Sequence, residues 1–119
     1  MKISPDEFNG FRKETFEFFS SLEKNNNKKF FDNNREIYEN YLVQPAKNLV
    51  ISLKPFFNQL NYSIRTEPKF DQTLMRISKD MRFHKTAPYR NYFLIHFGRF
   101  KMDSEFYVYL DKTGLSYGI

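Results

Sequence analysis

The chain has 119 residues, the size of one domain, and its formal net charge is +5 at pH 7. It contains no cysteine, which excludes disulfides, thiolate metal sites and a cysteine nucleophile. Aromatic residues make up 19% of the sequence, 15 Phe and 8 Tyr, and supply the volume for a core. With no long apolar run and no apolar leader, the sequence predicts a cytoplasmic protein without membrane contact.

The first segment is predicted to be a helix. Residues 4–7, Ser-Pro-Asp-Glu, combine an N-cap serine, a proline at the first helical position and a capping-box glutamate. Apolar side chains recur at helical spacing through residues 8–22. The Asn-Asn-Asn triplet at 25–27 should end this helix.

A second helix is predicted over about 28–42. Pro45 should kink or end it, and an apolar stripe at helical spacing then continues over 46–60, with Pro55 disturbing its last turns. We interpret the aromatic residues of these helices as core rather than as a stacking platform.

After residue 61, alternation of apolar and polar residues replaces the helical spacing. The predicted strands are 73–78, 91–97, 105–110 and 115–119. Residues 111–114, Asp-Lys-Thr-Gly, predict a hairpin turn between the last two strands. The chain is therefore predicted to be a single α+β domain, with N-terminal helices (about 5–60) packed on a C-terminal antiparallel β-sheet (about 62–119).

The positive charge is concentrated in the strand region. Residues 62–101 hold nine basic and three acidic side chains, a net +6. Within this region the run from 76 to 90 provides guanidinium forks, which suit phosphate or carboxylate, and ammonium point charges. The predicted ligand-binding residues are Arg76, Lys79, Arg82, Lys85, Tyr89 and Arg90. We expect an anionic, phosphate-bearing ligand, with nucleic acid as the leading candidate and Tyr89 and Tyr92 for stacking.

Asp80 has a special place in this run. Strand alternation puts Arg76 and Asp80 on one face, and Arg82 and His84 continue that face if the chain stays extended. The Asp80 carboxylate would then form ion pairs with the guanidiniums of Arg76 and Arg82. An alternative is a small enzyme that uses Asp80 and His84 as acid–base groups on an anionic substrate. A further alternative is a structural or partner-binding fragment, whose cations form only a cross-strand ladder of ion pairs.

The sequence gives no indication of a cofactor. There is no Gly-rich phosphate loop, and two histidines twelve residues apart without a carboxylate pair do not predict a metal site. We expect His96, in an aromatic strand, to be a half-buried residue with its hydrogen bonds satisfied.

Two blocks of sequence carry a resemblance. The first contains Phe18-Phe19, Asn25-Asn26, Phe30-Phe31, Asn34-Arg35, Tyr38-Glu39 and Pro45, and the second contains Arg76-Ile77, Asp80, Arg82-Phe83, Lys85 and Pro88-Tyr89-Arg90. In this order and spacing they resemble a widespread, mostly bacterial family of conserved hypothetical proteins, domain-of-unknown-function family 2461. The family has no assigned activity, so the resemblance implies no reaction.

The chain departs from this family in three ways. Phe30-Phe31 replaces the usual Trp-Phe pair, and the loop between Lys85 and Pro88 is a residue short. The chain also resembles only the N-terminal half of the longer family members. The last strand is therefore expected to be an unprotected sheet edge, which offers a route to homo-oligomers.

Overall fold

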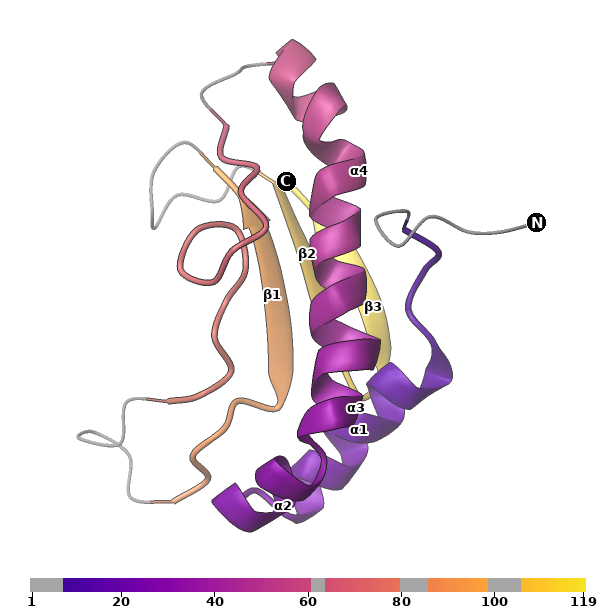
Figure 1. The fold of residues 1–119 in the computed structure, drawn as a ribbon. Coiled ribbons are helices and arrows are strands. Elements are labelled where there is room, and N and C mark those ends of the chain that lie inside the picture. Colours follow the sequence, from indigo (N-terminus) through magenta and orange to yellow (C-terminus); the bar gives the residue numbers. More distant parts are fainter. Residues whose placement is uncertain (1–7, 61–63, 80–85, 99–105) are drawn as a thin grey trace.

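Helices form the N-terminal part and a three-stranded antiparallel sheet the C-terminal part of the computed structural model, which describes residues 8–60, 64–79, 86–98 and 106–119 (Figure 1). The helices are α1 (Lys13–Lys24), α2 (Lys28–Asn33), α3 (Arg35–Tyr38), a π-helical turn η1 (Glu39–Val43) and α4 (Gln44–Leu60). The strands are β1 (Tyr92–Phe97), β2 (Phe106–Asp111) and β3 (Gly114–Gly118). The predicted α+β class is confirmed. Among the described residues, no helix combines the length and the apolar character that a membrane span needs.

Helix α1 begins later than the sequence predicts. The expected cap at residues 4–7 lies outside the described residues, and residues 8–12 are not helical. Gly10 has a φ of +89°, a left-handed conformation that suits glycine and interrupts the predicted helix. From Lys13 onward the expected pattern holds, and Phe18, Phe19 and Leu22 are buried.

The second predicted helix is divided into short pieces. Asn27 caps α2 by accepting a hydrogen bond from the Phe30 N–H at 2.8 Å. Asn34 separates α2 from α3, and its Nδ2 donates to the Phe30 carbonyl at 2.9 Å. An asparagine side chain that competes for backbone groups in this way disfavours a continuous helix. The single helix predicted over 28–42 is therefore wrong.

Pro45 does not end the helical region but lies in the first turn of α4, directly after η1. Because proline has no N–H, the Tyr41 carbonyl four residues earlier loses its usual helical donor. The hydroxyl of buried Thr15 donates to that carbonyl at 2.6 Å. This bond ties α1 to the middle of η1. Helix α4 then continues through Pro55 to Leu60.

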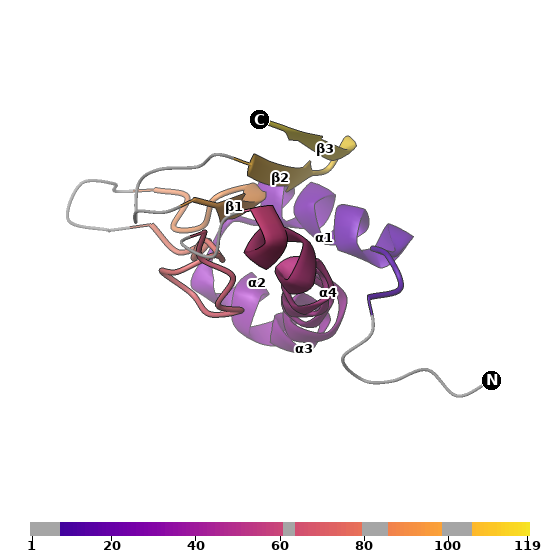
Figure 2. The ribbon, with the colours of Figure 1, turned by 90° about the horizontal axis from the view of Figure 1, so that it is seen from above.

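The described helices all lie on one face of the sheet (Figure 2). Its strand order is β1-β2-β3, with Phe93 opposite Leu110 and Ile95 opposite Val108. Phe93, Ile95 and Leu110 are fully buried, so these positions form the core with the helices. The hairpin predicted at residues 111–114 is confirmed, with Asp111 paired to Gly114.

Residues 73–79 run beside β1, but they do not form the continuous strand predicted over 73–78. The His96 N–H donates to Thr73 and the Met75 N–H to Leu94, at 2.9 and 3.1 Å. Further on, the Arg90 N–H donates to the Ile77 carbonyl at 2.7 Å. Because Met75 is bonded to Leu94 and Ile77 to Arg90, the three residues 91–93 lie opposite the single residue Arg76. This bulge breaks the ladder into the isolated bridges Leu74–Ile95 and Ser78–Tyr89.

Strand β3 extends beyond the cover of the helices. Leu115 and Tyr117 pair with Leu110 and Val108 on the helix-facing side, yet they are 45% and 79% exposed. An apolar groove of about 700 Å³ lies here. It is lined by Leu53, Phe56, Phe57, Phe97, Phe106, Tyr107, Val108, Tyr117, Gly118 and Ile119.

Candidate anion-binding site

Tyr89 lies at the centre of the candidate site, and Asn26 holds its backbone. The Tyr89 N–H donates to Asn26 Oδ1 at 2.9 Å, and Asn26 Nδ2 donates to the Tyr89 carbonyl at 2.6 Å. On its other side Tyr89 pairs with Ser78 in an antiparallel bridge, so the Asn26 amide acts in place of a further strand. The Tyr89 ring stacks on Phe31, with centroids 4.4 Å apart. Tyr89 is thus fixed by backbone and ring, and Phe31 covers one face of the ring.

Arg90, the next residue, joins the two extended segments. Its Nη1 donates to the carbonyls of Arg76 and Ser78 at 2.9 and 3.0 Å. Both bonds use the same nitrogen, so they orient the guanidinium without occupying its Nε–Nη2 edge. Arg90 is therefore a structural clamp, and its bonds to the described residues leave the Nε–Nη2 edge of the guanidinium unused.

The first of two hollows beside Tyr89 has a volume of about 520 Å³, and we call it the Lys79 hollow. Its lining residues are Glu23, Asn26, Lys79, Ala87, Tyr89, Arg90, Asn91 and Tyr92. Lys79 and Arg90 give it positive charge, and Glu23 is the one acidic group among its described lining residues. The Glu23 carboxylate is paired with Lys112 at 2.5 Å, which offsets its charge.

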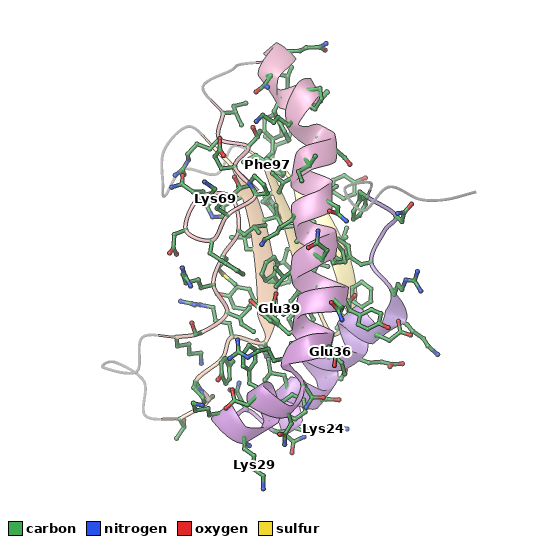
Figure 3. The ribbon with its side chains drawn as sticks, in the orientation of Figure 1. Lys24, Lys29, Glu36, Glu39, Lys69 and Phe97 are labelled. Atoms are coloured by element: carbon green, nitrogen blue, oxygen red, sulfur yellow. The ribbon has the colours of Figure 1, made fainter. Side chains whose placement is uncertain are left out.

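The second hollow has a volume of about 260 Å³, and we call it the Arg76 hollow. Its lining residues are Phe31, Arg35, Tyr38, Glu39, Phe70, Arg76, Ile77, Ser78 and Tyr89. Tyr89 therefore lies between the two hollows. Glu39, an acidic residue of this hollow, is labelled in Figure 3. The same view labels Lys69, which belongs to the segment 64–79 beside β1.

The two arginines of the Arg76 hollow are held alike. The Arg76 guanidinium lies 5.3 Å from the Phe70 ring centroid, and its Nε donates to Asp71 Oδ2 at 2.8 Å. The Arg35 guanidinium lies 4.9 Å from the Phe31 centroid, and its Nη2 is 3.5 Å from an Asp32 oxygen. Both side chains are more than half exposed, at 59% and 58%. Each fork is oriented by a ring and a carboxylate yet stays accessible from solvent.

Tyr38 adds a neutral donor to the Arg76 hollow. Burial, reinforced by the neighbouring Glu39 carboxylate, raises the pKa of the Tyr38 phenol well above its usual value. The positive charges of Arg76 and Arg35 act on the same phenol in the opposite direction. The hydroxyl therefore keeps its proton at neutral pH, and it can donate to an anion between the two guanidiniums.

The structure brings together four of the predicted ligand-binding residues. Lys79, Tyr89 and Arg90 line the Lys79 hollow, and Arg76 and Tyr89 line the Arg76 hollow. Arg82 and Lys85 lie outside the described residues, as do Asp80 and His84, the predicted acid–base groups. The carboxylate partner that the structure gives to Arg76 is Asp71.

Three residues of the site were not predicted: Asn26, Arg35 and Tyr38. The spacing Phe31–Arg35 is the four-residue step that places a cation over a ring on a helix, so this contact was detectable in the sequence. Asn26 was interpreted as a helix-end residue, and its bonds to Tyr89 span 63 positions, which local patterns do not report.

His96 is half-buried as predicted, but its hydrogen bonds are not all satisfied. Its backbone N–H donates to Thr73, whereas Nδ1 is buried without a hydrogen-bond partner among the described residues. Burial, together with the nearby charge of Arg65, lowers the pKa of the imidazole. The neutral ring is therefore the favoured form in the fold.

These features define an α+β protein whose sheet is covered on one face and carries two cation-lined hollows beside the start of β1. The chain belongs to the family described as "Conserved hypothetical protein (DUF2461)", whose model matches residues 14–119. No curated protein and no solved structure matches the chain significantly.

Proposed function

We propose that the protein binds an anionic, phosphate-bearing ligand at the two hollows around Tyr89, with nucleic acid as the leading candidate and the cytoplasm as the compartment. The observation that carries this proposal is the convergence of four cations, Arg35, Arg76, Lys79 and Arg90, on adjoining hollows. Arg35 comes from a helix that is distant in sequence from the two extended segments that carry the other three cations. The fold therefore brings these cations together.

Pre-orientation of the donors supports anion binding over a purely structural role. Arg35 and Arg76 already lie against the rings of Phe31 and Phe70 and pair with carboxylates, so less side-chain freedom is lost when a ligand binds. Isolated surface ion pairs contribute little to stability, so stabilisation alone does not account for this arrangement.

The division of the cations between two hollows favours a polyanion over a small ligand. Tyr89 separates the Arg76 hollow from the Lys79 hollow, and each contains positive charge. A chain of phosphates can contact both, whereas a single small anion contacts one.

The proposal is tested by binding of labelled nucleic acid over a series of salt concentrations. Affinity should fall steeply with salt, since phosphate contacts release counterions. Lys79→Ala should reduce the slope of log affinity against log salt by about one. Arg76→Ala should weaken binding roughly 10-fold, about 1.4 kcal/mol, and Arg76→Lys should recover only part of it because the fork is lost.

The matched control is Lys54→Ala, since Lys54 is an exposed lysine of α4 that lines neither hollow. It should leave both affinity and slope nearly unchanged. Binding that does not depend on salt, or that responds equally to the variants at 54, 76 and 79, would remove the proposal.

A further inference from the structure

The described helices leave one face of the sheet open (Figure 2). The strand register places a row of tyrosines on this face. Tyr92 on β1 and Tyr107 and Tyr109 on β2 alternate with the buried positions Phe93 and Leu110. Successive side chains of a strand point to opposite faces, so the three tyrosines belong to the open side. We call the surface that they form the tyrosine face.

The tyrosine face is partly open to solvent, since Tyr107 is exposed and Tyr92 and Tyr109 are half-buried. The rings of Tyr92 and Tyr109 are stacked, with centroids 5.4 Å apart and an angle of 21° between their planes. Tyr107 is 36% exposed and lies over Gly118, where an added Cβ would be 2.8 Å from its hydroxyl. The partner of Tyr109 on β3 is Ser116, another small residue. The Tyr107 ring thus packs across the Gly118 end of β3, and Ser116 places only a small side chain beside Tyr109.

This surface is continuous with the anion-binding site. Tyr92 belongs to the tyrosine face and also lines the Lys79 hollow, next to Lys79 and Arg90. The acidic partner of Tyr92 across the strands is Asp111, whose carboxylate accepts hydrogen bonds from the Thr113 N–H and hydroxyl at 2.8 and 2.5 Å. Asp111 thus forms hydrogen bonds within the β2–β3 turn. Its negative charge repels phosphates, so phosphates are expected on the Lys79 side of Tyr92.

We propose that the tyrosine face binds unstacked bases of a single-stranded nucleic acid whose phosphates lie in the Lys79 hollow. The inference rests on the proposed function and deepens it by naming the strandedness of the ligand. Bases of a single strand expose their faces for stacking on aromatic side chains. Bases of a duplex are stacked on one another and present only their edges, so a surface of exposed aromatic rings favours the single strand.

The test measures the affinity of the whole chain for a short labelled thymidine oligomer and for its duplex with the complementary strand. The single strand should bind more tightly than the duplex. Tyr109→Ala should weaken single-strand binding roughly 5- to 150-fold without changing the salt slope. Tyr109→Phe keeps the ring and should bind like the wild type. Thermal unfolding of both variants checks that the fold is retained.

A second readout uses the chain's own fluorescence. With eight tyrosines and no tryptophan, emission from the protein comes from tyrosine alone. Stacking of bases should quench it when the oligomer binds, and Tyr109→Ala should reduce the quenched fraction.

Two results would overturn this inference while leaving the proposed function in place. One is equal affinity for single strand and duplex, with Tyr109→Ala binding like the wild type but Lys79→Ala weaker. The other is binding of neither nucleic acid while tripolyphosphate still binds and loses affinity in Lys79→Ala. If tripolyphosphate also fails to bind, the proposed function fails as well.

Discussion

Asn26 and Tyr89 are joined by a pair of hydrogen bonds in which one side-chain amide serves both backbone groups of the tyrosine, at 2.9 and 2.6 Å. Asn26 belongs to the loop between α1 and α2, and Tyr89 precedes β1. The pair therefore attaches the helical layer to the segment that separates the two hollows.

Replacing Asn26 should destabilise the fold. Asn26→Ala removes both partners of the Tyr89 backbone and leaves a partly buried N–H and carbonyl unpaired, at a cost of about 1–3 kcal/mol. Urea unfolding measures the difference. Asn25→Ala is the matched control and should cost clearly less, because the side chain of exposed Asn25 bonds, within the described part of the chain, to Ser21 of its own helix end. Equal losses for the two variants would argue against the role assigned to Asn26.

Thr15 and Pro45 should be energetically coupled through the Tyr41 carbonyl. Thr15→Val removes the hydroxyl donor and should cost about 1–3 kcal/mol, since Pro45 cannot supply an N–H. In a Pro45→Ala background the new N–H can donate to Tyr41, so the same change should cost less. A double-mutant cycle measured by chemical denaturation reports this coupling. Strict additivity would count against it.

Replacing Arg90 should affect both stability and ligand binding, whereas replacing Lys79 should affect binding alone. Arg90→Ala removes the bonds to the Arg76 and Ser78 carbonyls, so it should lower stability by about 1 kcal/mol and weaken binding of a polyanion. Lys79→Ala should weaken binding with little effect on stability. Thermal unfolding combined with binding assays distinguishes them, and a stability loss confined to the Lys79 variant would contradict the assignment.

The lowered pKa of His96 predicts that the fold loses stability on mild acidification. Its pKa is lowered in the fold from 6.5, so on acidification the unfolded chain takes up the proton first. Stability should therefore be full above about pH 6.5 and should fall as the pH decreases toward the folded-state pKa. Unfolding is compared at about pH 7.5 and 5.5 in a His84→Asn variant, where His96 is the one remaining histidine. His96→Phe in that background should reduce the difference, and stability that rises on acidification would contradict the prediction.

The elements that local patterns specify were predicted correctly. Apolar spacing located the buried face of α1 at Phe18, Phe19 and Leu22, and alternation located β1 and β2. The turn residues Asp111 and Gly114 located the final hairpin.

The features that local patterns missed depend on contacts distant in sequence or on competition at one residue. The helix is interrupted at Asn34, whose side chain bonds to a carbonyl of its own helix. The helical region continues past Pro45, where the Thr15 hydroxyl donates to the Tyr41 carbonyl that the proline cannot serve. The same holds for the site. The run from Arg76 to Arg90 identified one side of it, but Arg35 and Tyr38 join from the helices only after folding.

The bulged segment beside β1 also limits how copies of this protein can associate. Residues 73–79 bond to the outer edge of β1, whereas the outer edge of β3, the one away from β2, has no strand beside it among the described residues. Of the three strands in the described part of the sheet, β3 is therefore the one left open for pairing. Two copies joined antiparallel through β3 would occupy each other's open strand and leave none for a third, so the stoichiometry of such assembly ends at two and does not continue into a filament.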